Sequence, residues 1–273
     1  MPPITSRVIT STLHPYRTVK RVSSKIIFLS CEGSVTEENY IDLVSNLFSD
    51  IESKIKMISV AEDATHTWPK RRTPEQNSML GKNRPKQLVE RIDQYKIDRE
   101  STFEFSKYPE DEFWIVTDVD KNWSTEEIPG SNGKTYIEEW NEAISMCQER
   151  NYCYAVSNPC FEMWLLLHHD AVKDADKRYA VTETHVFEST RHYQERLREL
   201  DVPLKDKKHI LPEHYTVEKV DAAISRAKEL HPDRTDLSPK YYATTVYLLL
   251  EKIKDMLPNT ENKAVLEDTN VCR

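Results

Sequence analysis

Residues Phe28–Tyr40, FLSCEGSVTEENY, run from an apolar stretch through a carboxylate and a glycine into a predicted helix. The apolar residues at its start have the length and composition of a buried strand. Glu32 stands where that strand is expected to end. Gly33, one of only 4 glycines in the chain, permits a sharp turn and the close approach of a ligand. Because Ser34 and Glu37 form a capping pattern for the helix, the stretch predicts a strand, a tight turn and a helix, with Glu32 held on the turn.

Strand-like and helix-like segments alternate through the first two thirds of the chain. Strands are predicted at Lys25–Ser30, Lys56–Ala61, Glu112–Thr117 and Tyr152–Ser157. Helices are predicted at Asn39–Glu52, Lys86–Arg99, Thr135–Arg150 and Cys160–His168, with Pro159 in the first turn of the last, and then at Phe187–Leu200, Val217–Leu230 and Tyr241–Leu257. Such alternation is typical of an α/β fold with a parallel sheet flanked by helices.

The chain is predicted to have four parts. Residues 1–24 form a basic flexible arm, 25–170 the α/β core, 171–257 a C-terminal helical lobe packed on the core, and 258–273 a tail. The long polar segment Glu62–Pro85 is expected to be a loop within the core.

Carboxylates gather at the predicted strand ends. Asp118 and Asp120 follow the strand in FWIVTDVDKNW, and alternation of strand side chains would turn both toward one point. Since ligands collect at the carboxyl ends of parallel strands, Glu32 and this pair are the candidate catalytic residues. Their mutual repulsion calls for a hard divalent cation, Mg²⁺ or Mn²⁺.

Three further residues have a structural explanation beside a functional one. Glu162 could be an outer metal ligand, but an acid in the first helical turn also favours the helix dipole. His168 could support the site from behind, but it ends an apolar helix face, as packed core histidines do. Glu37 could likewise support the site or serve only as a cap.

Composition limits the partners and the compartment. The net charge is −8, and residues 1–31 carry five basic residues and no acid. The remaining 33 basic and 46 acidic residues exclude nucleic-acid binding by bulk attraction, so local patches would have to do it. The best patch contains Lys70, Arg71, Arg72, Lys82, Arg84 and Lys86, with Lys121 beside the aspartate pair; a second basic run, Leu204–His209, is opposed by Asp206. No apolar run is long enough to span a membrane, and the five cysteines suit neither a disulfide framework nor zinc, so a cytoplasmic protein with reduced thiols is expected.

Three motifs, IIFLSCEGSVTEENY, FWIVTDVDKNW and SNPCFEMWLLLHH, together resemble the RloB-like family. This family is of Toprim type and is found in prokaryotic defence loci. The resemblance implies a Toprim-like core with an acidic site at Glu32, Asp118 and Asp120. It also implies metal-dependent nuclease activity in an anti-phage or abortive-infection role, with an AAA-type ATPase as a possible partner and a possible homodimer.

The expected function is therefore Mg²⁺- or Mn²⁺-dependent hydrolysis of phosphodiester bonds in DNA or RNA, including tRNA. Two alternatives stay open. The chain could be a non-catalytic sensor or adaptor that binds an AAA-type ATPase. It could also be an Asp-x-Asp phosphatase, with Asp118 as nucleophile and Asp120 as acid, although Glu32 would then have no role.

Overall fold

A computed structural model of the protein describes residues 25–33, 35–48, 54–58, 83–179, 189–236 and 242–257. Within these ranges the strands are β1 (Ile27–Cys31), β2 (Ile55–Met57), β3 (Glu112–Asp118), β4 (Cys153–Asn158) and β5 (Ala243–Thr244). The α-helices are α1 (Thr36–Leu47), α3 (Pro85–Phe103), α4 (Tyr136–Arg150), α5 (Phe161–Leu167), α6 (Asp174–Lys177), α7 (Ser189–Glu199), α8 (Val217–Leu230) and α9 (Val246–Asp255). Short 3₁₀ helices are η3 (Phe105–Lys107), η4 (Asp120–Trp123) and η5 (Pro212–His214).

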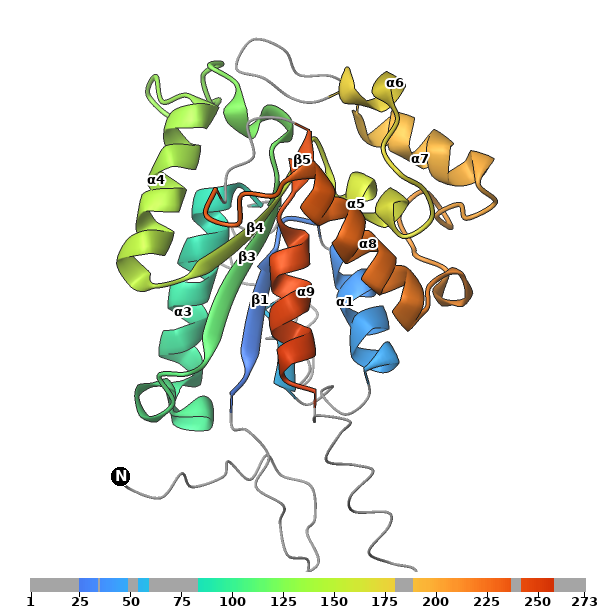
Figure 1. The fold of residues 1–273 in the computed structure, drawn as a ribbon. Coiled ribbons are helices and arrows are strands. Elements are labelled where there is room, and N and C mark those ends of the chain that lie inside the picture. Colours follow the sequence, from blue (N-terminus) through green and yellow to red (C-terminus); the bar gives the residue numbers. More distant parts are fainter. Residues whose placement is uncertain are drawn as a thin grey trace, which may run out of the picture.

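The strands form one sheet in the order β2-β1-β3-β4-β5 (Figure 1). The first four are parallel, and β5 runs antiparallel to β4. All five residues of β1 are buried, as expected of a parallel strand covered on both faces. The predicted fold class, an α/β fold with a parallel sheet flanked by helices, is confirmed.

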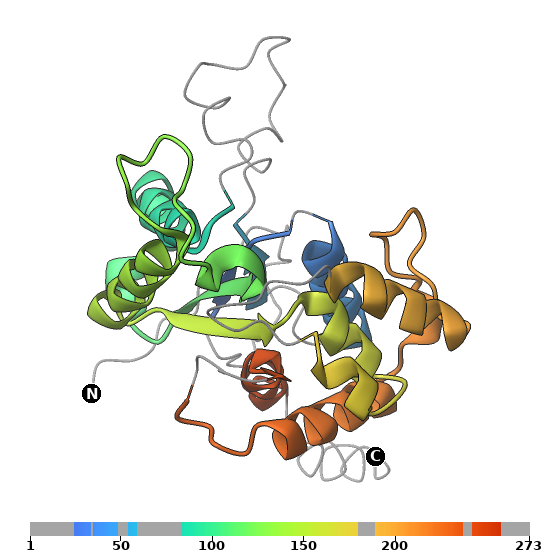
Figure 2. The same ribbon diagram turned by 90° about the horizontal axis from the view of Figure 1, so that it is seen from above.

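Helices cover both faces of the sheet, and the two hydrophobic clusters divide accordingly (Figure 2). On one face Phe28 packs among the aromatic rings of α3, η3 and β3. On the other face Ile27 and Leu29 share a cluster with α1, α5, α7, α8 and α9. The predicted C-terminal helices α7 and α8 therefore pack on the core through the same apolar layer as α1.

The last segment returns to the sheet. The sequence predicts one helix over Tyr241–Leu257, but β5 forms first and α9 begins at Val246. Thr245 makes two hydrogen bonds to Val156 of β4. The Thr245 N–H donates to Val156 O at 2.8 Å, and Thr245 Oγ1 accepts the Val156 N–H at 2.8 Å. Two residues of strand are too short for a periodic signal, because their pairing depends on a partner far away in the chain.

Other element boundaries also shift. Pro159 was expected inside the helix, but it follows a cis peptide bond and lies before α5, whose N-cap is Cys160. The first helix starts at Thr36 rather than Asn39, and β2 starts at Ile55 rather than Lys56. The arm at 1–24, most of the loop Glu62–Pro85 and the tail at 258–273 lie outside the described residues. No helix in the described ranges combines the length and the apolar character needed to cross a membrane.

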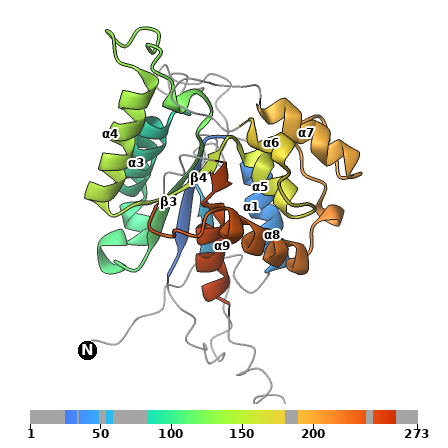
Figure 3. The same cartoon turned by 45° about the horizontal axis from the view of Figure 1, so that its top comes forward.

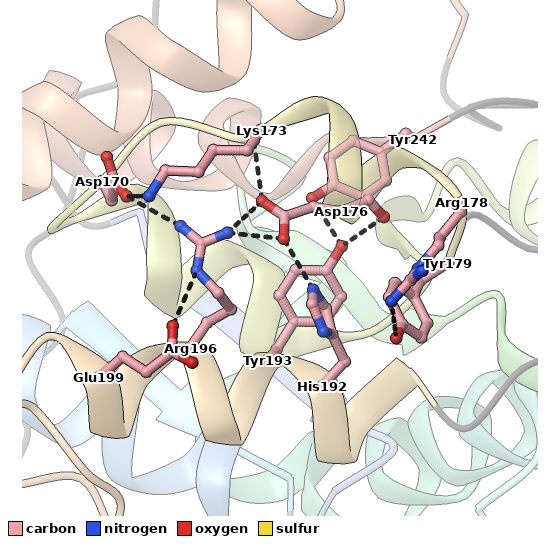
Figure 4. A network of polar contacts seen from close by, with 10 residues as sticks. All are labelled: Asp170, Lys173, Asp176, Arg178, Tyr179, His192, Tyr193, Arg196, Glu199 and Tyr242. Atoms are coloured by element: carbon pink, nitrogen blue, oxygen red, sulfur yellow. Dashed lines mark hydrogen bonds and ion pairs between the residues drawn. The ribbon is translucent and has the colours of Figure 1, made fainter.

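A buried ion pair ties α6 to α7 (Figure 4). Arg196 Nη1 donates to both carboxylate oxygens of Asp176, at 2.6 and 2.5 Å, and Nη2 donates to Asp170 Oδ2 at 2.8 Å. His192 Nε2 lies 2.7 Å from Asp176 Oδ1, and its ring stacks on Tyr179. Burial acts to raise the pKa of Asp176, but the hydrogen bonds from Arg196 and His192 outweigh it and hold that pKa below its ordinary value. The network holds α7 firmly against the body.

Replacing Asp176 with Asn is expected to lower the free energy of unfolding by about 3 kcal/mol or more, because a buried guanidinium loses its main counter-charge. Urea denaturation measures this. Asp174→Asn is the matched control on the same helix, since the Asp174 side chain is 95% exposed and its pair with Lys177 is a solvated surface pair that contributes little to stability. Equal denaturation midpoints for the two variants would contradict a stabilising role for the buried pair.

Candidate functional site

The carboxyl ends of β1, β3 and β4 meet at one edge of the sheet, at the top of Figure 1. β1 and β3 are neighbours, yet the chain leaves β1 into α1 on one face and leaves β3 toward α4 on the other. This divergence is the topological switch point at which open α/β sheets bind ligands. Figure 3 brings this edge forward, with α5, α6 and α7 beside it.

Glu32 is anchored at this switch point by the end of β3. Its backbone N–H donates to Val116 O at 2.9 Å and so extends the pairing of β1 with β3. Its carboxylate oxygen Oε2 accepts hydrogen bonds from Thr117 Oγ1 at 2.5 Å, Asp118 N at 3.1 Å and Asn122 Nδ2 at 3.4 Å. Burial raises the pKa of Glu32 to about 7, even though these bonds act to lower it.

Gly33 lies directly against the carboxylate of Glu37. A Cβ built at Gly33 would lie 2.5 Å from Glu37 Oε1, which instead accepts the Gly33 N–H at 3.0 Å. Gly33 does not have a left-handed backbone, and the group that approaches it closely is the Glu37 carboxylate. Burial, followed by the charges of Glu162 and Glu32, raises the pKa of Glu37 to about 7. Ser34 lies outside the described residues, and the N-cap is Val35 without a side-chain bond.

Asp118 and Asp120 enter the site by different routes. Asp118 is the last residue of β3, whereas Asp120 begins η4 with a positive φ of 28°. The argument from strand alternation is therefore wrong, because the strand ends between the two residues. Burial raises the pKa of Asp118, and the charges of Glu37, Glu32 and Glu162 raise it further against a bond from the Phe161 N–H. Burial also raises the pKa of Asp120.

Glu162 completes the group from the first turn of α5. Its side chain is buried, and Oε1 accepts a hydrogen bond from Gln194 Nε2 of α7 at 3.2 Å. Burial raises the pKa of Glu162, and the charge of Asp120 acts in the same direction.

His168 has a structural explanation. Its Nδ1 lies 3.0 Å from Trp164 O and its Nε2 lies 3.0 Å from Tyr40 Oη, so both ring nitrogens are occupied. Burial lowers the pKa of His168 to about 3, so the ring is neutral. The ring thus joins α1 to α5 and makes no hydrogen bond to a carboxylate.

Five carboxyl groups, from Glu32, Glu37, Asp118, Asp120 and Glu162, consequently lie within electrostatic reach of one another. Every one has a raised pKa, which means that the folded chain disfavours their charged forms. Such an oxygen-rich, like-charged group suits a hard cation such as Mg²⁺ or Mn²⁺ in donor chemistry. Within the described ranges no three His, Cys, Asp or Glu side chains already converge as a metal-binding group, and Glu32 and Glu37 instead accept bonds from the chain's own donors.

The predicted basic patch is only partly described. Lys70, Arg71, Arg72 and Lys82 lie outside the described residues. Arg84 Nε pairs with Glu139 Oε1 at 2.6 Å and Lys86 Nζ with Glu142 Oε1 at 2.7 Å, so these two connect α3 to α4. Lys121 is exposed, with Nζ 5.4 Å from the centre of the Tyr136 ring.

Sequence reasoning missed Thr117, Asn122 and Gln194. Asn122 stands within the quoted motif FWIVTDVDKNW, and its amide beside two carboxylates was a usable signal. Thr117 looked like an ordinary strand residue. Gln194 carries no local signal, because its contact with Glu162 depends on where α7 packs.

Comparison with known proteins adds one finding. The family model described as RloB-like protein matches residues 27–253, which is most of the chain. No curated protein and no solved structure matches. The matched range includes β1, the acidic residues at the switch point and nearly all of α9. The chain therefore belongs to the RloB-like protein family.

Proposed function

We propose that the protein is a Mg²⁺- or Mn²⁺-dependent nuclease that hydrolyses phosphodiester bonds of DNA or RNA. The observation that carries the proposal is the group of five carboxyls with raised pKa values at the switch point of the sheet. Glu37 and Glu162 are buried, and Glu32, Asp118 and Asp120 are half-buried. Holding so many carboxyls together costs stability unless a cation offsets their charge, so cation binding explains the arrangement best.

Asp118 and Asp120 would hold the cation, with Glu162 as an outer ligand and Glu37 supporting Gly33. Glu32 would either ligate a second ion or act as the general base toward the attacking water. When bound, the ion supplies charge stabilisation at the phosphoryl oxygens and lowers the pKa of an attacking water. Glu32 suits a general base, since a pKa of about 7 matches neutral pH. The hydrogen bonds it accepts within the described part of the chain go to Oε2, so we assign the water proton to Oε1. The water oxygen forms the new bond to phosphorus as the bond to the leaving oxygen breaks.

Membership of the RloB-like family supports a role in prokaryotic anti-phage defence, with an AAA-type ATPase as the proposed partner, pairing of two copies and a cytoplasmic location. The phosphatase alternative is weaker, because Glu32 is anchored to the end of β3 and that chemistry gives it no role.

The test incubates the purified protein with plasmid, single-stranded DNA and tRNA, each with Mg²⁺, Mn²⁺ or EDTA. Cleavage is expected with a divalent ion and not with EDTA. Glu32→Gln is expected to slow cleavage by ~100-fold or more, since it removes the proton acceptor. Failure to cleave any of the substrates with either ion would overturn the proposal and favour the non-catalytic adaptor.

A further inference from the structure

Residues Lys205–His209 form a tight basic turn. Lys205 and His209 exchange backbone hydrogen bonds at 2.8 Å in both directions, and Lys208 N donates to Lys205 O at 3.1 Å. Asp206 and Lys207, at the centre, have positive φ values of 51° and 64°. Glycine is the residue that adopts this left-handed conformation most readily, because it has no Cβ. Lys207 therefore places a charged side chain at a position where the backbone conformation favours glycine.

The turn is fastened to the rim of the acidic group by two hydrogen bonds. Gln194 Nε2 donates to Lys207 O at 3.0 Å and also to Glu162 Oε1 at 3.2 Å, so one amide joins the turn to a carboxyl of the site. On the other side, Thr36 Oγ1 donates to Lys208 O at 3.1 Å, and Thr36 directly precedes Glu37 of the acidic group. The polar network of Figure 4 fixes α7, and through Gln194 it fixes the turn as well.

The lysines of this turn are exposed and uncommitted. Lys205, Lys207, Lys208 and His209 are all exposed. No ion pair within the described ranges involves the three lysines, whereas Arg84 and Lys86 of the predicted patch are paired with carboxylates of α4. Because the three lysines form no ion pair within the described ranges, their charges remain available to attract another anion.

We infer that the turn Lys205–His209 binds the phosphate backbone of the nucleic acid on which the carboxyl site acts. This inference rests on the proposed nuclease function and adds where the substrate lies. Lys205, Lys207 and Lys208 contact phosphates that flank the scissile one, and they offset the repulsion between the strand and the acidic group. The contacts read charge and not base identity, so the turn accepts DNA or RNA of any sequence.

The test measures binding without cleavage, in an Asp118→Asn background, by fluorescence anisotropy of labelled single-stranded DNA and RNA. The variant is Lys207→Gly with Lys208→Gln. It is expected to weaken binding about 10- to 30-fold at 0.1 M salt and to reduce the slope of log K against log salt by about 1.4. Glycine suits the left-handed position, so the melting temperature is expected to be unchanged or higher.

The matched control is Lys107→Gln with Lys254→Gln, which removes the same charge from exposed or partly exposed lysines. η3 precedes β3, so Lys107 lies at the opposite edge of the sheet. Binding and slope are expected to match the parent. A second variant, Lys207→Arg with Lys208→Arg, is expected to retain the slope.

Unchanged affinity and slope in the glycine–glutamine variant, or an equal loss in the Lys107 and Lys254 control, would overturn the role of the turn. Neither outcome bears on the nuclease proposal, which the cleavage assay decides separately. If the Asp118→Asn parent bound neither DNA nor RNA, the proposal that the turn contacts the substrate would also be contradicted.

Discussion

Replacing Asp118 with Asn is expected to abolish cleavage and, in the absence of metal, to raise the melting temperature. The activity loss is expected to reach at least ~100-fold, because even groups that only orient metal ligands contribute 10- to 100-fold. The gain in stability has the opposite origin. Partial burial and the charges of Glu37, Glu32 and Glu162 disfavour the charged form of Asp118, and an amide removes that repulsion. Each kcal/mol recovered raises the melting temperature by about 2–4 °C in a protein of this size.

The opposite signs separate a functional role from misfolding, since a misfolded variant would lose both activity and stability. Asp93→Asn is the control. Asp93, on α3, accepts hydrogen bonds from Arg150 and Tyr152, so its loss is expected to lower the melting temperature and leave cleavage unchanged. Full activity in Asp118→Asn, or a lower melting temperature than the parent at pH 8, would contradict the assignment.

The second large effect is a pH dependence that a divalent ion reverses. Glu32 and Glu37 have folded pKa values of about 7 against an ordinary 4.5. Between these values the folded chain binds more protons than the unfolded chain, so their contribution to stability falls as pH rises from 4.5 and is fully lost above 7. Each pKa unit corresponds to about 1.4 kcal/mol. A bound Mn²⁺ favours the charged forms of Glu32 and of the neighbouring Glu37, so it is expected to raise the melting temperature at pH 8 and hardly at pH 5.

The buried His168 and the half-buried His169 act in the other direction, so their contribution to the pH dependence must be subtracted. Burial lowers the pKa of His168 to about 3 and that of His169 to about 4, so their contribution to stability rises with pH up to about 6.5. The measurement therefore compares wild type with a Glu32→Gln/Glu37→Gln variant, in which the histidines are unchanged. The difference in melting temperature between the two is expected to widen as pH rises from 5 to 8. A constant difference, or an equal Mn²⁺ effect at both pH values, would refute cation binding by these carboxyls.

Most of the α/β alternation was predictable because strand and helix periodicities act over a few residues. β1, β3 and β4 were all found, along with the helices that follow them. The errors fall where an element's end depends on its neighbours. β3 stops at Asp118: Val119 N still bonds to Ser157 O of β4, but Asp120 has a positive φ and its N–H bonds to Pro159 O as the chain turns into η4. β5 has only two residues and exists through its pairing with β4.

The candidate site divides in the same way. The order of residues near Glu32, Asp118 and Glu162 was enough to mark each as an acid at the end of a strand or the start of a helix, since these signals are local. Their meeting required the folded chain. Glu32 contacts Asp118 across 86 positions and Gln194 reaches Glu162 across 32, because strand order and the packing of α7 bring them together. Burial, which raises the pKa values of these carboxyls, is likewise a property of the packed layers and not of any single segment.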